Sequence, residues 1–467
     1  MWLEYEILTK SLLTRNAVGY MLSAQALAHF QKAKNLKDHF VLLDPEVGFT
    51  SSVIIQPDRF VGRADLIQNS MRAINASSSL ITVFGKRGVG KSSLLRQIQL
   101  IATGDYEIAQ RSGLAHMVPN KPRKYYTVFY TCDSQISDIN DLLLRLCTDT
   151  DPEDGLLRLV PDKGKELTEF SRSNEENASV DLKILKWGGK GQDAEKYSSN
   201  LRSDAVQTFR NFCSSVVEHN NKWWKKRDGL IIFLDEFDVI SDKSGIGSLI
   251  KSLSSSRLKF AISGIADDLS SLIEDHGSVE RLIEQGYAHV TPMNIEETAL
   301  IFRRACEFYD GQLTFEDSVV EKIFEISMGY PYFSQLIGKR CVEEGNANGT
   351  NEITQSILQS VLDEISAGRA FPHLERKYKM AVGASDGRAM LLTLLAEENV
   401  SIDDVEGGIS LKAVRNIAQD LQIEFMDQLV PRLIDKKYGP ALVRVQDQRG
   451  TYEFLDPVLR AYVRLRK

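Results

Sequence analysis

The sequence is poor in residues that crosslink a chain or anchor it in a membrane. It contains five cysteines in 467 residues, widely spaced and without a CxxC pair. This usage argues against a disulfide framework or a cysteine-based zinc site, and it predicts a reducing, cytoplasmic setting. No apolar run approaches the roughly 20 residues that a membrane span needs. We therefore expect no contact with a membrane.

Excess positive charge is also missing. The formal net charge is −7, with 26% charged and 43% hydrophobic residues, which is ordinary for a globular protein. A chain with this balance is no generic binder of polyanions, so any contact with nucleic acid must come from a local basic patch. The length exceeds one typical core and predicts two or three domains.

Several short, almost wholly apolar segments are predicted to form one parallel α/β sheet of five strands. Helical stretches separate most of them, which is typical of a sheet covered on both faces. The predicted strands are Ser78–Gly85, Tyr125–Cys132, Gly229–Leu234, Arg257–Gly264 and Ala288–Pro292. The long stretch at about 134–228 has a polar middle and is interpreted as an insertion with a mobile loop.

A phosphate-binding loop follows the first strand. The segment GKRGVGKS at Gly85–Ser92 matches the pattern G-x-x-x-x-G-K-[ST] in full. Its glycines let backbone N–H groups turn toward phosphates, and the following helix adds the positive end of its dipole. Lys91 is expected to reach the β and γ phosphates, and the Ser92 hydroxyl to hold Mg²⁺. The predicted nucleotide-binding residues here are Gly85, Lys86, Arg87, Gly88, Val89, Gly90, Lys91, Ser92 and Ser93.

Two acids end the third apolar strand. Asp235 and Glu236 follow the uncharged segment Leu230–Leu234. Beside a phosphate loop, Asp235 is predicted to orient Mg²⁺, and Glu236 to polarise the water that attacks the γ phosphate. Asp238 is interpreted as a helix or turn residue and not as a catalytic one.

Three further polar residues are candidates with open alternatives. Ser263 at the end of the fourth strand either hydrogen-bonds the water or the γ phosphate, or is a turn residue. Arg281 either faces the nucleotide of a neighbouring subunit or is a surface arginine. Arg63, in FVGR, either contacts the nucleotide or forms a stabilising salt bridge.

The order of these motifs resembles the P-loop ATPases of the AAA+ and STAND type, over roughly residues 58–467. Archaeal-type and replication-initiator-like ATPases with a C-terminal winged helix look most similar. The resemblance implies that FVGR seats the adenine, that Gly329–Pro331 is a lid motif, and that Pro331 packs near the base. Members of the AAA+ type usually carry a lid arginine where this chain has Tyr332. Lys339 and Arg340 are the alternatives for that role, and the departure favours a slow switch over a processive motor.

The resemblance and the pattern together suggest four regions. These are an N-terminal helical segment (1–57), an ATPase core (58–294), a helical lid and connector (295–384) and a winged helix (385–467). The connector is placed at the basic stretch Arg369–Lys379. The winged helix is predicted from helices at Arg388–Glu397, Leu411–Asp420 and Glu424–Lys437, followed by a hairpin of Leu442–Gln446 and Thr451–Leu455.

The charge of the C-terminal region leaves its partner open. From Asp386 onward it holds 12 basic and 13 acidic residues, which is poor for a surface that follows phosphates. A local patch on the wing and tail is still expected from Arg444, Arg449, Arg460, Arg464, Arg466 and Lys467. The alternative is that this module packs on the ATPase core or on a partner as a lock.

Three functions are consistent with the sequence. The first is a slow ATPase that uses ATP and Mg²⁺ as a molecular switch and assembles or remodels a partner complex, as a homo-oligomer or with a companion effector. Mobile-element or phage-defence biology is its expected setting by analogy of fold alone. The second is a DNA-binding initiator or transposition-type regulator. The third is an assembly module whose bound nucleotide is structural.

Overall fold

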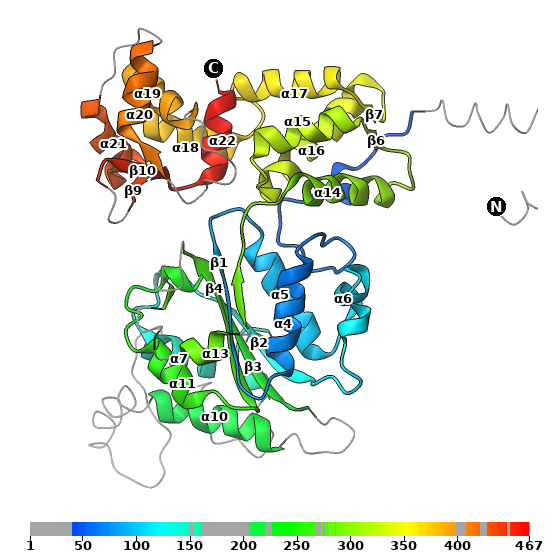
Figure 1. The fold of residues 1–467 in the computed structure, drawn as a ribbon, viewed down its shortest axis with the longest axis vertical. Helices are drawn as coiled ribbons and strands as arrows, with labels where there is room; N and C mark the ends of the chain where they lie inside the picture. The colour runs from blue at the N-terminus through cyan, green and yellow to red at the C-terminus, as the bar shows by residue number, and fades with distance from the viewer. Residues whose placement is uncertain are drawn as a thin grey trace, which may run out of the picture.

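The computed structural model describes residues 40–149, 151, 153–159, 205–219, 227–266, 272–273, 277, 279–284, 286–397, 408–420, 427–445 and 449–466. Figure 1 shows a sheet-containing core below two smaller bodies, a helical one and a C-terminal one, which lie side by side above it. Most of the predicted helical segment 1–57 lies outside the described residues. Its described part, residues 40–57, has no regular secondary structure apart from the single turn α3 (Pro45–Gly48).

The core is built on a five-stranded sheet in the order β2-β3-β4-β1-β5. All its strand pairs are parallel, which confirms the predicted α/β fold. The strands are β1 (Leu80–Gly85), β2 (Tyr125–Thr131), β3 (Gly229–Asp235), β4 (Leu258–Ile265) and β5 (Tyr287–His289). This order places β4 between β1, which leads into the phosphate loop, and β3, which ends in the two acids.

Helices cover both faces of this sheet (Figure 1). Alternate strand residues point to opposite faces, so Val83 and Phe233 belong to one apolar core while Phe84 and Leu234 belong to another. The first core includes α4 (Ala64–Asn75) and α5 (Lys91–Thr103), with the short α6 (Glu107–Arg111) beside them. The second includes α7 (Ile139–Thr148), α10 (Ala205–His219), α11 (Ile246–Leu253) and α13 (Glu280–Ile283).

The helical body begins directly after the core. It contains α14 (Ile295–Phe308), α15 (Asp317–Ser327), α16 (Pro331–Asn348) and α17 (Gln355–Ser366), with a two-stranded pair of β6 (Thr314–Phe315) and β7 (Glu352–Ile353). The N-terminal segment packs on this body, since the Asn346 amide exchanges hydrogen bonds of 3.0 and 2.7 Å with the backbone of Leu43. We call this body the lid.

The C-terminal body differs from the prediction at its start and its end. Most of the stretch Arg369–Lys379, which was interpreted as a connector, is helical and lies in α18 (Pro372–Val382), whose Leu374 and Val382 are buried. At the other end α22 (Pro457–Leu465) was not predicted, although Asp456 caps it and Pro457 opens it, which is a recognisable helix start.

Between these helices the described elements follow the predicted order. They are α19 (Asp386–Glu397), β8 (Ile409–Ser410), α20 (Leu411–Asp420), α21 (Val430–Ile434), β9 (Leu442–Arg444) and β10 (Thr451–Phe454). The strands pair antiparallel in the order β8-β10-β9. The predicted third helix, Glu424–Lys437, is reduced to α21 with a 3-10 turn on each side, and 421–426 lie outside the described residues. The winged helix therefore stays a prediction.

In the part of the chain that the structure describes, no helix has both the length and the apolarity to cross a membrane.

A buried lysine on β4 caps the C-terminal end of α4. Lys259 of β4 is fully buried, and its Nζ donates to the carbonyls of Ala73, Ile74 and Ala76 at 2.9, 2.8 and 2.8 Å. The last carbonyls of a helix lack partners within the helix, so an ammonium group satisfies them and also meets the negative end of the dipole.

Replacing Lys259 tests this arrangement. We expect Lys259→Met to lower the free energy of unfolding by about 2–4 kcal/mol, because it removes a charged donor from three carbonyls, which keep only Ser79, Tyr125 and Arg123 as side-chain donors. Burial lowers the pKa of Lys259 to about 7, so urea unfolding is measured at pH 6, where the side chain is charged. The control is Lys251→Met on the exposed side of α11. Equal stability of the two variants would contradict the capping role.

Candidate nucleotide-binding site

The loop between β1 and α5 has the curled backbone that the sequence predicts. Gly85, Gly88 and Gly90 have φ values of 146°, 84° and 98°, where a side chain is disfavoured. A Cβ atom on Gly85 would also lie 2.2 Å from the carbonyl oxygen of Val290, so glycine is required there for packing as well. The N-terminus of α5 begins at Lys91 and points its free N–H groups into this turn.

Lys91 lies inside the loop and is held by it. Its Nζ donates to the carbonyl oxygen of Lys86 at 3.0 Å. Burial lowers the pKa of Lys91 to about 8, and the nearby carboxylates of Asp238 and Asp235 only partly offset this effect. A cation that is poorly solvated in the free protein is well suited to gain a triphosphate as its partner.

The two predicted acids stand at the end of β3 in different environments. Asp235 is buried, and its Oδ1 accepts a hydrogen bond of 3.0 Å from the backbone N–H of Glu236. Glu236 is exposed and has a left-handed backbone with φ 53°. Such strain in a residue other than glycine is often stored at functional sites. Asp238 accepts from the N–H of Ile265 at 2.8 Å, which joins the loop after β3 to the end of β4.

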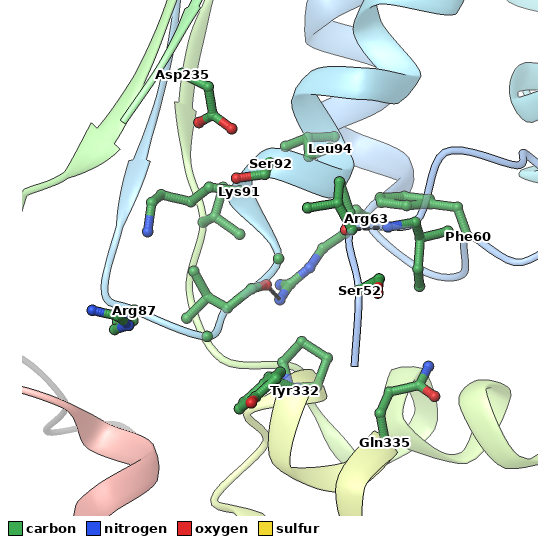
Figure 2. A pocket seen from close by; sticks show the side chains of 18 of the residues that line it. Ser52, Phe60, Arg63, Arg87, Lys91, Ser92, Leu94, Asp235, Tyr332 and Gln335 are labelled. Atoms are coloured by element: carbon green, nitrogen blue, oxygen red, sulfur yellow. Dashed lines mark hydrogen bonds between the residues drawn. The ribbon is translucent and has the colours of Figure 1, made fainter. Parts of the chain in front are cut away.

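One cavity of 370 Å³ collects most of the predicted residues. Figure 2 shows Lys91, Ser92 and Asp235 on one side of it, with Phe60, Ser52 and Gln335 on the other. The predicted residues that line it are Arg63, Arg87, Gly88, Val89, Gly90, Lys91, Ser92, Ser93, Asp235, Glu236 and Pro331. Gly85, Lys86, Ser263 and Arg281 are not among its lining residues.

The oxygen atoms near the loop are suitable ligands for a hard divalent cation. The Ser92 hydroxyl and the Asp235 carboxylate line the same cavity and supply the oxygen ligands that Mg²⁺ prefers, with phosphate oxygens and water as the natural remainder. These two residues therefore fit the predicted metal site.

The far end of the cavity is apolar. Its walls include Ile54, Phe60, Val61, Met293 and Pro331, which come from the N-terminal segment, the core and the lid. A planar base fits such a lining, whereas the charged loop end fits phosphates.

Arg63 borders the cavity but is occupied by other contacts. Its guanidinium donates to the carbonyl oxygens of Thr291 at 2.6 Å and Val89 at 3.4 Å, and it pairs with Glu297 at 3.7 Å. Arg63 thereby joins the phosphate loop to the junction between core and lid. These contacts match the stabilising alternative, while a contact with nucleotide stays a prediction.

Ser263 lies beside Asp235 on the sheet. The two residues follow the paired Leu234 and Ile262, so they are neighbours on adjacent strands and share a face. Ser263 is fully buried, and its Oγ has no hydrogen-bond partner among the described residues. An unpartnered hydroxyl next to a metal-binding carboxylate is unusual for a plain turn residue.

Apart from Arg63, the predicted arginines and lysines outside the loop lie away from the cavity. Arg281 is exposed on α13 and lines no part of this cavity. Lys339 pairs with Glu46, and Arg340 pairs with Glu343 and Glu364. The suggested substitution of Lys339 or Arg340 for a lid arginine is therefore not supported by their positions.

Sequence reasoning missed the N-terminal segment that crosses the cavity. We call residues 50–55 the strap. The Ile54 N–H donates to the Ser93 hydroxyl at 3.0 Å, and Gln97 Nε2 donates to the carbonyls of Ile54 and Ile55 at 3.2 and 2.9 Å. On the lid side, the Thr50 N–H donates to Gln335 Oε1 at 3.1 Å. No motif marks these residues, because they act through their backbone.

The observed strand order and phosphate loop define the fold. The chain has a P-loop NTPase-type α/β fold. No protein-family model matches it, and no curated protein matches its sequence.

Solved structures with a similar course of the chain include a Walker-type ATPase of Pyrococcus abyssi. The two sequences are 14% identical, the alignment covers 88% of this chain and 98% of the other, and the TM-score is 0.42. A Thermotoga maritima RuvB variant has 12% identity over 87% and 96% of the two chains, with a TM-score of 0.41. The Aeropyrum pernix ORC2 protein has 12% identity over 86% of this chain and 91% of its own, with a TM-score of 0.37.

The lowered pKa of Lys91 predicts a pH dependence of ATP binding. The free side chain loses its proton above about pH 8, while bound phosphates raise its pKa. Binding therefore takes up a proton above pH 8, and the dissociation constant rises with pH by up to about tenfold per unit.

Titration calorimetry at pH 7.5 and 9.5, in two buffers of different ionisation enthalpy, measures both effects. Lys91→Arg is the control, because its cation does not titrate in this range. An unchanged affinity without proton uptake in the wild-type protein would contradict the placement of Lys91.

Proposed function

We propose that this protein binds ATP with Mg²⁺, hydrolyses it slowly and uses it as a conformational switch. The single observation that carries the proposal is the shared cavity. A curled glycine loop, a half-buried lysine, a hydroxyl and two acids line one end, and apolar groups line the other. Its volume of 370 Å³ lies within the range of about 300–1,000 Å³ that is usual for ligand sites.

The hydrolytic step follows from the roles of these residues. Ser92 and Asp235 would hold Mg²⁺, which neutralises phosphate charge when bound. Glu236 accepts a proton from water as the water oxygen attacks the γ phosphorus, and the bond from that phosphorus to the β–γ bridging oxygen breaks to give ADP and phosphate. Lys91 stabilises the charge that develops on the phosphoryl oxygens. Ser263, which lies next to Asp235 on the sheet, is our candidate for a group that orients the same water or the γ phosphate.

The contacts of the phosphate loop support a switch. The N–H of Tyr332 in the lid donates to the Gly88 carbonyl at 3.4 Å. Lys86 pairs with Glu453 of β10 at 2.7 Å, and a Cβ on Gly88 would lie 3.0 Å from Val458 of α22. A nucleotide that displaces Lys91 from the Lys86 carbonyl changes the loop that both bodies touch. We infer that the C-terminal body acts as a lock whose docking depends on the nucleotide.

An assembly role follows from the exposed arginine. Arg281 is available on the surface of α13, and we propose that it reaches the nucleotide of a neighbouring copy or serves contact with a companion effector. A STAND-type switch in phage defence or mobile-element biology is the setting we favour, by analogy of fold.

DNA binding is a second candidate for the C-terminal body. Arg444, Arg449 and Arg464 are exposed and favour it. However, Arg460 donates to the Ala396 carbonyl and Arg466 pairs with Glu375 at 3.0 Å, so two members of the predicted patch contact the protein itself. This reduces the basic surface that could follow a phosphate backbone. An initiator-type regulator would retain DNA in an ATP-dependent manner at low salt, whereas a purely structural nucleotide would show no turnover.

Glu236→Gln tests the hydrolytic role. We expect ATP binding to persist and the hydrolysis rate to fall by about 10²-fold or more, because the amide cannot accept the proton of the water. Phosphate release and nucleotide binding are measured on the same preparation. Asp238→Asn is the matched control and is expected to retain a larger share of activity. Full activity of Glu236→Gln would rule out the assignment.

Glu453→Gln tests the lock without altering the phosphate loop. We expect nucleotide to dissociate up to about fivefold faster, since a half-exposed ion pair contributes about 1 kcal/mol or less. Stopped-flow release of a fluorescent ATP analogue provides the rate, with Glu397→Gln as a control on the exposed end of α19. Identical release from both variants and the wild-type protein would argue against coupling through this pair.

A further inference from the structure

One lid residue presents an unused donor to the apolar end of the cavity. Gln335 lies one turn after Pro331 in α16 and is only 8% exposed. Figure 2 shows its side chain at the far side of the cavity from Lys91 and Asp235. It is thus a polar side chain near the apolar walls of the cavity, which Thr50, Ser51 and Ser52 of the strap also line.

The strap fixes which end of the amide faces the cavity. The Thr50 N–H can only donate, and it lies 3.1 Å from Gln335 Oε1. The oxygen must therefore occupy that branch, which leaves Nε2 on the other one. Among the described residues no acceptor binds Nε2. Because Gln335 lines the cavity, an occupant that displaces water from Nε2 is expected to provide an acceptor in its place.

The surroundings limit what that occupant is. Phe60, Val61 and Met293 supply apolar surface at this end, and Arg63 directs its guanidinium at backbone carbonyls and Glu297. No phosphate is favoured at such a position. A planar heterocycle with ring-nitrogen acceptors satisfies both the apolar walls and the donor.

We propose that Gln335 is a specificity-determining residue whose Nε2 donates to a ring nitrogen of the adenine base. This inference rests on the proposed function, because the phosphate loop must hold the triphosphate for the base to reach the lid. The same amide then binds the strap through Oε1 and the nucleotide through Nε2. Base binding thereby joins the N-terminal segment to the lid across the cavity.

The test compares ATP with inorganic tripolyphosphate, each with Mg²⁺, by titration calorimetry on the full chain. Tripolyphosphate occupies the loop end but has no base. We expect Gln335→Met to weaken ATP binding roughly tenfold and to leave tripolyphosphate binding unchanged, as loss of one buried hydrogen bond implies. Gln359→Met on α17 is the control, because that glutamine is exposed.

A second variant separates base recognition from support of the strap. Gln335→Glu retains an acceptor for the Thr50 N–H but removes the donor, so it should weaken ATP binding in the same selective way. Equal losses for ATP and tripolyphosphate in both variants would show a structural role and overturn the inference. Unchanged ATP affinity would overturn it too. If the wild-type protein binds neither ligand, the proposed function itself fails, and the inference fails with it.

Discussion

The curled backbone between β1 and α5 is the constraint on which the rest of the structure depends. Gly85 must approach the Val290 carbonyl, and Gly88 and Gly90 must adopt positive φ values. Only this path directs the first N–H groups of α5 and the Lys91 ammonium to one point. The neighbouring strands then bring Asp235 to the same point, because carboxyl ends of parallel strands meet at one edge of a sheet.

The same loop is also where the three bodies of the protein meet. Lys86 contacts β10, Gly88 contacts the lid and α22, and Val89 contacts Arg63 at the junction of core and lid. Individually these contacts are modest, since partly exposed ion pairs contribute little. Their importance is geometric: a loop that is packed on three sides cannot change shape without changing its neighbours. This argues for a nucleotide-dependent arrangement of the lid and the C-terminal body.

Much of the core could be predicted from the sequence, because its signals are local. Buried parallel strands such as Gly229–Leu234 are continuous apolar runs, and the loop pattern fixes both the turn and the helix that follows. The lid and the C-terminal body were harder to predict from the sequence. Arg369–Lys379 has few apolar residues, yet the stripe of Leu374 and Val382 is enough for a helix once α19 and α22 cover it.

The parts of the site that were missed act through backbone or long-range contacts. The strap binds Ser93, Gln97 and Gln335 through its peptide groups, which have no side-chain signature. Likewise, the contacts of Arg63 with Thr291 and Glu297 span more than two hundred residues of sequence, and no spacing rule predicts them. Ser263 could be placed beside Asp235 only after the strand order was known, because β3 and β4 need not have been neighbours.

Equilibrium dialysis with labelled ATP, on the wild-type protein and on Lys91→Ala, tests the central claim most directly. The account predicts one Mg²⁺-dependent nucleotide per chain in the wild-type protein and a loss of that binding in the variant, because the lysine is the main cation at the phosphate end of the cavity. Binding of ATP with equal affinity to Lys91→Ala, or no binding to the wild-type protein, would contradict it.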